Sequence, residues 1–210
     1  MYIPRLFHED NWPQIRHVIE ENGFATIVSC SAGVPTATHV PLRLDESADG
    51  TAKLQGHMSK ANPHWRLLER DGRSLAIFTG PHSYVSPRWY DHVNVPTWNY
   101  IAVHVYGKPR LVVAEEKHEL MKGLVDQYEG HAETEDRYSL EGLPADFLES
   151  QMKGIVAFEI VVDEIQASFK LSQNRDQKNY ENVIAELRKS DNQNSQRVAQ
   201  VMSGRRCPKP

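Results

Sequence analysis

The sequence predicts a β-rich α+β fold: a single barrel of six or more mostly antiparallel strands with Greek-key-like connections, peripheral helices and a C-terminal helical tail. Three observations carry this prediction. Six apolar or alternating segments have the length of strands, the amphipathic segments lie at their margins, and the chain shows neither an internal repeat nor a domain linker. We therefore expect one barrel domain over residues 1–172 and a helical tail, partly mobile, over residues 173–210.

Composition indicates an ordinary globular protein. The 210 residues are 40% hydrophobic and 25% charged, enough for a full core. The formal net charge of −4 argues against a uniformly basic nucleic-acid surface. No apolar run reaches the length of a membrane span and the N-terminus lacks the features of a signal peptide, so we expect a cytoplasmic protein without membrane contact. Cys30 lies in an apolar segment and is expected to be a small buried hydrophobe.

The N-terminal part of the chain predicts a helix followed by an antiparallel meander. Asp10 can cap a helix over residues 11–22, and Gly23 ends it. The apolar and alternating runs that follow predict strands over residues 24–30, 36–44 and 51–58. Ser59 or Asn62 can cap the next helix, which we expect to reach Arg70.

The rest of the chain predicts three more strands and two more helices. Strands are expected over residues 75–78, 98–113 and 154–165, and helices over residues 115–128 and 174–189. Gly107 interrupts the long second strand and indicates a bulge or a bend of the barrel. The segment 80–97 is a proline-punctuated aromatic loop, of a length that is usually functional or packed on a partner. Residues 191–210 are polar.

One candidate binding motif follows the strand that ends near residue 58. His57 to Asn62 places Ser59 and Lys60 where a strand enters a predicted helix, so that backbone N–H groups, a hydroxyl and a cation meet in one place. This combination suits a terminal phosphate. An ordinary helix cap followed by a solvated lysine explains the same residues.

A second motif opens the long strand. Alternation places Trp98 and Tyr100 on one face of the sheet and Asn99 on the other. The aromatic pair can stack on an isoalloxazine ring, and it can equally fill a core or a dimer interface. An aromatic surface together with an anion-binding strand end is what a flat, phosphate-bearing cofactor needs, and flavin mononucleotide (FMN) is the leading candidate.

Other kinds of site are weakly signalled. The sequence contains no Walker motif, no G-x-G-x-x-G, no G-x-S-x-G elbow and no H-E-x-x-H. Its ten histidines are scattered, so a metal or haem site rests only on single residues such as His39 or His57 facing a cofactor. For DNA, the only candidate is the helix over residues 174–189 with the basic residues after it, and a solvated helix packed on the barrel or a second subunit explains it too.

Several segments, taken in order, resemble the PaiB-type family, FMN-binding negative transcriptional regulators with a split-barrel fold related to pyridoxamine-phosphate oxidases. The matching segments are residues 1–4, 56–63, 78–84, 86–90, 95–100 and 170–174, which span most of the chain. The resemblance implies a single FMN-binding split β-barrel and a homodimer with FMN at the subunit interface.

The resemblance also implies roles for individual residues. His39 and Val40 would present backbone groups to the flavin ring. Gln55, His57, Ser59 and Lys60 would address the ribityl chain and phosphate, and Trp98, Asn99 and Tyr100 would approach from the long strand, from either subunit. Related phosphate sites often carry two adjacent basic residues, whereas here only Lys60 is basic. Lys170 or Arg175 would then supply the second cation.

Three functions remain at this point. The first is a dimeric FMN-binding protein that acts as a negative transcriptional regulator or a flavin or ligand sensor, with DNA contacted through the C-terminal helices. The second is an FMN-dependent oxidoreductase on the same scaffold, and the third is a haem- or metal-binding relative. No catalytic residue and no metal ligand is assigned from the sequence.

Overall fold

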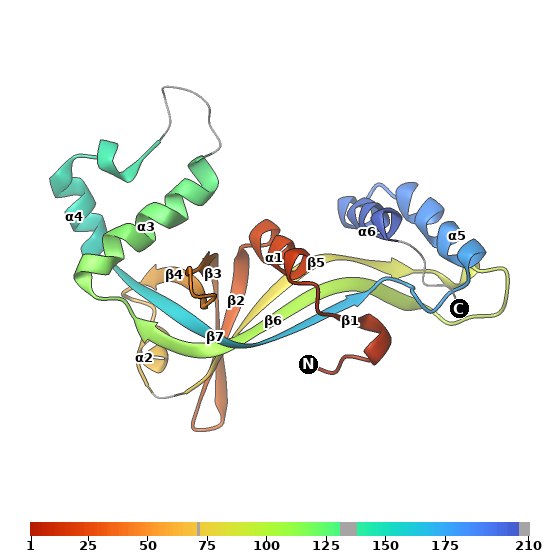
Figure 1. The fold of residues 1–210 in the computed structure, drawn as a ribbon, viewed down its shortest axis with the longest axis horizontal. Coiled ribbons are helices and arrows are strands. Elements are labelled where there is room, and N and C mark those ends of the chain that lie inside the picture. The colour runs from red at the N-terminus through yellow and green to blue at the C-terminus, as the bar shows by residue number, and fades with distance from the viewer. Residues whose placement is uncertain (71, 131–137, 206–210) are drawn as a thin grey trace. The chain divides into compact units, whose positions relative to one another are not determined.

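The computed structural model describes residues 1–70, 72–130 and 138–205, and Figure 1 shows the fold. The strands of this part of the chain are β1 (His8–Glu9), β2 (Phe24–Ser31), β3 (Val34–Glu46), β4 (Ala52–Ser59), β5 (Ser74–Val85), β6 (Thr97–Leu111) and β7 (Ile155–Lys170). They form one sheet in the order β1-β7-β4-β3-β2-β5-β6, and β6 also pairs with β7. The last pairing closes six strands into a barrel, which confirms the predicted fold class.

Helices border this sheet along the chain. They are α1 (Trp12–Glu21), α2 (Trp65–Leu68), α3 (Ala114–Glu129), α4 (Ala145–Lys153), α5 (Gln177–Arg188) and α6 (Gln193–Gly204), with short 3₁₀ turns η1 (Arg5–Phe7), η2 (Pro87–Trp89) and η3 (Leu140–Gly142). None of these helices is both long and apolar enough to cross a membrane, within the residues that the structure describes.

The chain divides into two compact units, each built from separate segments. Unit 1 comprises Met1–Val18, Thr79–Val103 and the chain from Gln166 onward, and unit 2 comprises Ile19–Phe78 and His104–Ile165. The domain boundary expected at residue 172 stays a prediction.

Unit 2 is organised around the antiparallel meander β2–β3–β4. β2 pairs with β3 from Phe24↔Pro41 to Ser31↔Val34, β3 pairs with β4, and β4 pairs with β7 up to Ser59↔Ile155. Alternate side chains point into the core, and Ile27, Leu54 and Phe158 are fully buried there. The predicted meander is therefore confirmed, and the register places the end of β4 beside the start of β7 and the middle of β3.

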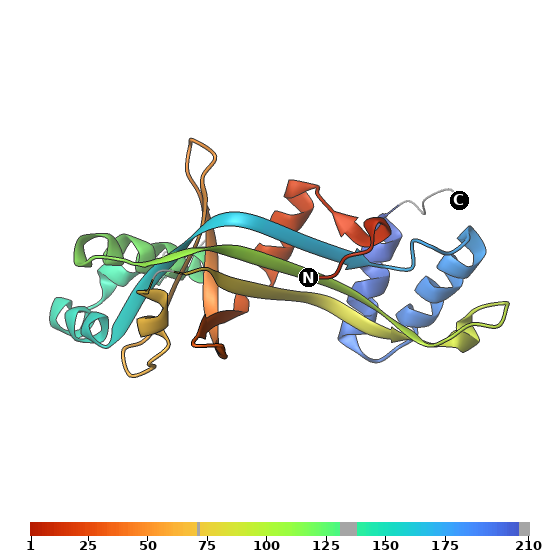
Figure 2. The same ribbon diagram turned by 90° about the horizontal axis from the view of Figure 1, so that it is seen from below.

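Unit 1 carries the C-terminal helices. α5 and α6 lie side by side in both views (Figures 1 and 2). Val183 and Leu187 of α5 and Val198 of α6 are fully buried, and the hydroxyl of Tyr180 donates to the carbonyl of Met202 at 2.9 Å. The polar segment expected after Asp191 is therefore a packed helix from Gln193 to Gly204, while residues 206–210 lie outside the described part.

Two helix predictions need correction. Asn11, not Asp10, caps α1, because the Asn11 Oδ1 accepts from the Gln14 amide at 3.1 Å. The helix expected to reach Arg70 is only the single turn α2. Residues 59–62 form a turn, and the Asn62 Oδ1 accepts from the His64 amide at 3.0 Å. The helix therefore begins only at Trp65.

The end of one strand and the burial of Cys30 were also predicted wrongly. β5 continues to Val85, so the first part of the expected loop over residues 80–97 is strand. Cys30 is exposed rather than buried. The pleat explains this, because Ser29 is buried and its neighbour in the strand must point to the opposite face.

Candidate functional site

A groove in unit 2 lies where β3 and β4 meet the junction between α4 and β7. Its volume is about 450 Å³, within the range of small-molecule sites. The lining residues are Thr38, His39, Val40, Pro41, His57, Met58, Ser59, Asn62, Gln151, Gly154 and Ile155. We call it the β3–β4 groove. It contains four of the residues that the sequence predicts for the site: His39, Val40, His57 and Ser59.

The turn after β4 differs from the expected phosphate cradle. The Lys60 amide donates to the Gly154 carbonyl at 2.9 Å, the Ala61 amide to Ser59 Oγ at 3.2 Å and the Asn62 amide to the Ser59 carbonyl at 2.9 Å. The expected backbone N–H groups are therefore already used. The Ser59 hydroxyl and the exposed Lys60 ammonium are what this turn can offer an anion.

His57 is the most unusual residue of the groove. Its Nδ1 is buried and has no hydrogen-bond partner among the described residues. Burial lowers the pKa of His57, and the positive charge of Lys117 lowers it further. The imidazole is therefore neutral at neutral pH, with a polar atom in the groove wall that a bound ligand can satisfy.

A polar network supports the β3 side of the groove. The Thr38 hydroxyl lies 2.8 Å from His64 Nδ1 and accepts from Asn62 Nδ2 at 3.2 Å. His64 is almost fully buried, and burial lowers its pKa. On the exposed edge, the Phe24 ring stacks near His39, with 6.2 Å between ring centroids.

Sequence reasoning missed a second lysine in unit 2. Lys117 of α3 donates from its Nζ to the carbonyls of Met152 and Ile155, the latter at 2.7 Å. Burial, and then the charge of Lys60, lower the pKa of Lys117. The two lysines line one cavity, which is separate from the β3–β4 groove, although 57 positions lie between them in the sequence.

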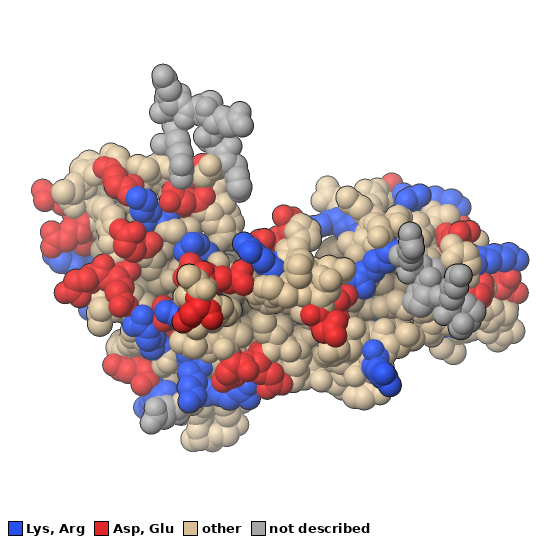
Figure 3. Space-filling model, viewed as in Figure 1, with Lys and Arg blue, Asp and Glu red and all other residues tan. Residues whose placement is uncertain are grey.

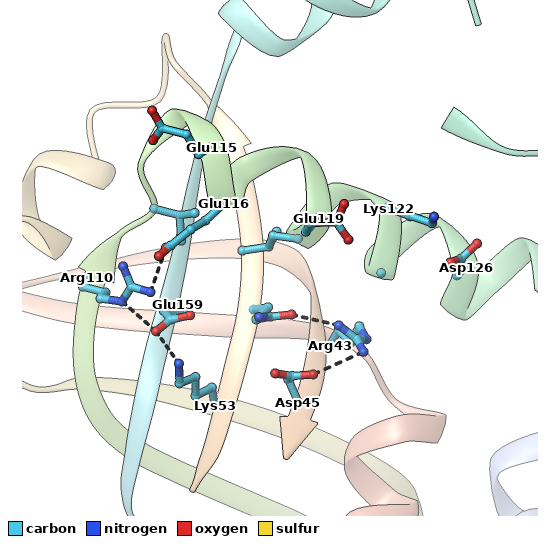
Figure 4. Close-up of a pocket in the computed structure, with 14 residues that line it drawn as sticks. Arg43, Asp45, Lys53, Arg110, Glu115, Glu116, Glu119, Lys122, Asp126 and Glu159 are labelled. Carbon is cyan, nitrogen blue, oxygen red and sulfur yellow. Dashed lines mark hydrogen bonds and ion pairs between the residues drawn. The ribbon is translucent and has the colours of Figure 1, made fainter. Parts of the chain in front are cut away.

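Gln55 lies outside the groove, in a larger cavity of about 640 Å³ that Lys53 of β4 also lines (Figure 4). Its Oε1 accepts from Arg43 at 2.9 Å. Figure 4 shows Glu159 between two cations: its Oε1 lies 3.1 Å from Lys53 Nζ and 2.7 Å from Arg110 Nε. Hydrogen bonding to Glu159 raises the pKa of Arg110. Gln55 is therefore bonded to Arg43 of β3, which also pairs with Asp45, and the separate Glu159 network links β4, β6 and β7.

The other predicted residues belong to unit 1. Asn99 is fully buried, and its Nδ2 lies 3.0 Å from Ser172 Oγ. Trp98 is 53% exposed, and its ring meets that of Tyr84 edge-on at 6.1 Å. Tyr100 is half-buried, and Lys170 Nζ donates to Thr97 Oγ1 at 2.7 Å. Within this unit Asn99 and Lys170 are used in packing contacts, while Trp98 offers an open aromatic surface.

The histidines form no visible metal centre. Among the residues that the structure describes, no three His, Cys, Asp or Glu side chains are placed to hold a metal ion. His57, His64 and His104 each have a buried ring nitrogen without a partner, but they do not gather around one point with other ligands.

The fold places this chain in the class of split-barrel proteins, as comparison with solved structures shows. The FAD and heme binding protein from Mycobacterium smegmatis is similar with a TM-score of 0.59 and 15% identity, over 78% of this chain and 73% of that chain. The flavocytochrome Anf3 from Azotobacter vinelandii is similar with a TM-score of 0.60 and 16% identity, over 86% of this chain and 78% of that chain.

Sequence comparison then gives the family. Residues 1–164 match the family model described as "Putative FMN-binding domain". The chain is also 41% identical, over 96% of each sequence, to "Protease synthase and sporulation protein PAI 2" from Bacillus subtilis (strain 168). This chain belongs to that FMN-binding family, of the PaiB type. The predicted family, fold and cofactor are thereby confirmed.

Proposed function

We propose that this chain binds FMN in the β3–β4 groove and acts as a dimeric negative transcriptional regulator or ligand sensor. The observation that carries the proposal is the buried, unpartnered Nδ1 of His57 in the groove wall. A buried polar atom without a partner costs stability, and a polar group of a bound flavin would relieve that cost. FMN supplies reversible one- and two-electron chemistry when it is bound.

The groove fits the parts of FMN. Pro41 offers a partly exposed apolar surface to the isoalloxazine ring, while backbone groups of His39 and Val40 can meet the polar edge of the ring. Ser59 and Asn62 can bond the ribityl chain and phosphate. We assign the phosphate's charge to Lys60, which is exposed at the turn after β4, whereas Lys170 is bonded to Thr97. The proposal leaves Asn99 and Gln55 to packing.

Exposed aromatic rings support the dimer. Phe24 is 71% exposed and stacks on His39 at the edge of the groove in unit 2. In unit 1, Trp98 and Tyr84 present a second exposed aromatic pair. Exposed aromatic surfaces of this kind mark interfaces, so a second copy that covers them would also close the cofactor site. In that assembly Trp98 and Tyr100 would be the residues that reach the flavin.

A sensing role is better supported than an extended DNA-binding surface. Lys178 of α5 is paired with Asp91 at 2.9 Å, and Lys189 with Glu186 at 2.6 Å. Figure 3 shows acidic and basic residues alongside one another over the C-terminal helices. The name of the Bacillus subtilis relative links it to protease synthesis and sporulation, which supports a regulatory function. We keep the cytoplasm as the proposed location. DNA contact through α5 and α6 is the dependent part of this proposal.

Flavin titration of the full chain tests the proposed site. Lys60 is exposed, so its contact with a phosphate should contribute about 1–2 kcal/mol, which is about 5- to 30-fold in affinity. Lys60→Ala should weaken FMN by that factor and leave riboflavin unchanged, because only FMN carries the phosphate. Lys108→Ala, an exposed lysine of β6 outside the groove, is the matched control. Equal weakening of both flavins would assign Lys60 a structural role, and no flavin uptake at all would remove the cofactor proposal.

Two further measurements separate the functions. Light scattering with and without FMN tests the dimer, which a strictly monomeric protein would exclude. A gel-shift series over salt concentration tests DNA contact, and no retardation at low salt would remove it. Steady consumption of NADH or NADPH by the flavin-loaded protein would instead favour the oxidoreductase.

A further inference from the structure

A separate cavity in unit 2 lies between the start of α3 and the end of α4. Its volume is about 440 Å³, again in the range of small-molecule sites. The lining residues are Lys60, Leu111, Val112, Ala114, Lys117, His118, Glu149, Met152, Lys153, Ile155, Val156 and Ala157. We call it the α3–α4 cavity. Figures 1 and 2 show the end of α4, where the chain enters β7, near the start of α3.

The floor of this cavity is apolar and well supported. Leu111, Val112, Met152 and Val156 contribute its side chains. Val112 packs against the buried cluster of Leu120, Leu124 and Ala157, and its amide donates to the Ala157 carbonyl at 3.0 Å. The floor is therefore continuous with the core of unit 2, and an apolar ligand body would meet a preformed surface.

The rim of the same cavity is cationic. Lys153 is neutralised by Glu149, whose Oε1 lies 2.7 Å from its Nζ. Lys60 and Lys117 have no carboxylate within ion-pair distance among the described residues. α3 begins at Ala114, so the positive end of its dipole faces the same space. Two ammonium groups that repel one another over an apolar floor favour an anion between them.

Lys117 is held in place for such a role. Its Nζ donates to the carbonyls of Met152 and Ile155, which uses two of the three ammonium hydrogens. These bonds fix the side chain at the wall of the cavity before any ligand arrives. Preorganised, partly desolvated charges bind anions more strongly than flexible surface lysines do.

We propose that the α3–α4 cavity binds a small organic carboxylate with an apolar body, whose carboxylate pairs with Lys117. The apolar floor favours an amphipathic molecule over inorganic phosphate. The lysines without a carboxylate partner favour an acid over its neutral analogue. Lys117 lines this cavity and not the β3–β4 groove, so the cavity would give a ligand sensor a second ligand. The inference does not depend on flavin binding.

Calorimetric titration of the full chain with octanoate and octanamide tests the site, because the two probes share the same chain and differ in charge. Wild-type protein should bind octanoate at least about tenfold more tightly than octanamide. Lys117→Met should abolish that preference, whereas Lys122→Met on the same helix, whose lysine pairs with Glu141, should keep it. Equal affinity for the two probes in wild type, or an undiminished preference in folded Lys117→Met, would overturn the proposal.

A second variant covers the case in which Lys117→Met fails to fold. Ala114 is exposed at the first position of α3 and lines the cavity. Ala114→Phe should therefore fill the cavity without disturbing the core, and octanoate affinity should fall about tenfold or more. Unchanged octanoate binding in this variant would place the probe elsewhere. Riboflavin and FMN titrations of the same proteins report on the groove separately, so the two proposals can fail independently.

Discussion

Replacing Gly107 with alanine should destabilise unit 2, because β7 leaves no room for a side chain on β6. A Cβ at Gly107 would lie 2.2 Å from the Val161 carbonyl oxygen, 2.7 Å from Ile160 Cγ2 and 2.8 Å from the Val161 carbonyl carbon. Two of these three atoms are backbone and cannot rotate away. The strands must separate locally by about an ångström to restore ordinary contact.

The size of the effect follows from this geometry. Overpacking of a close-packed site costs about 1–3 kcal/mol, and a clash with backbone belongs at the upper end of that range. Alanine recovers about 0.4–1 kcal/mol by restricting the unfolded chain. The net loss is then about 2–3 kcal/mol, which lowers Tm by about 4–12 °C in a chain of this size.

Thermal unfolding followed by circular dichroism measures this loss, with Gly142→Ala as the control. A Cβ at Gly142 would meet nothing closer than Ser139 Oγ at 3.7 Å, so that variant should melt within about 0.5 kcal/mol of wild type. If Gly107→Ala melts with the control, the backbones of β6 and β7 do not approach at this point. The glycine would then mark flexibility rather than the strand contact that we infer.

Two other predictions follow from buried titratable groups. Burial lowers the pKa of His57, His64 and His104 from 6.5, so the stability that their neutral rings contribute is fully present above pH 6.5 and is lost as the pH falls through the lowered pKa values. The urea midpoint of unfolding should therefore be lower at pH 5.5 than at pH 7.5. An unchanged midpoint would mean that the imidazoles protonate freely in the folded protein. Glu159 is 3% exposed and lies between Lys53 and Arg110, so Glu159→Gln should lower the free energy of unfolding in urea by about 2 kcal/mol. The control Glu116→Gln, at an exposed ion pair with Arg110, should lower it by less than about 0.5 kcal/mol. Equal losses would show that the ion pairs of Glu159 are solvated.

The sequence predicts best where contacts are local. β2, β3 and β4 are successive antiparallel strands, so their alternation is enough to place His39, Val40, His57 and Ser59 in one groove. Alternation does not show that β5 runs on through Pro81, because proline ordinarily ends a strand. The helix α6 had a usable signal: Ser195, Val198, Ala199 and Met202 are buried at helical spacing, but small and polar residues made the apolar face hard to recognise.

Contacts between distant segments account for the rest. Asn99 follows a strand pattern that suits a ligand site, but its partner Ser172 lies 73 positions away and holds the amide inside unit 1. In the sequence, the amides after Ser59 resemble a free phosphate cradle. In the structure, the Lys60 amide already donates a hydrogen bond to the Gly154 carbonyl. No local pattern reports whether a polar group already has a partner, so residue types alone overstate what a motif has left to bind.

The junction between α4 and β7 explains why the two lysines act together although neither predicts the other. Gly154 accepts from the Lys60 amide, and Met152 and Ile155 accept from the Lys117 ammonium, so three residues of one short segment position both lysines. The same junction contributes Gly154 to the β3–β4 groove, Met152 to the α3–α4 cavity and Ile155 to both. A ligand that shifts this backbone in one site would therefore be expected to move the lysines as well. Since coupling of this kind is reciprocal, a sensor built on this junction needs no longer pathway between its two ligands.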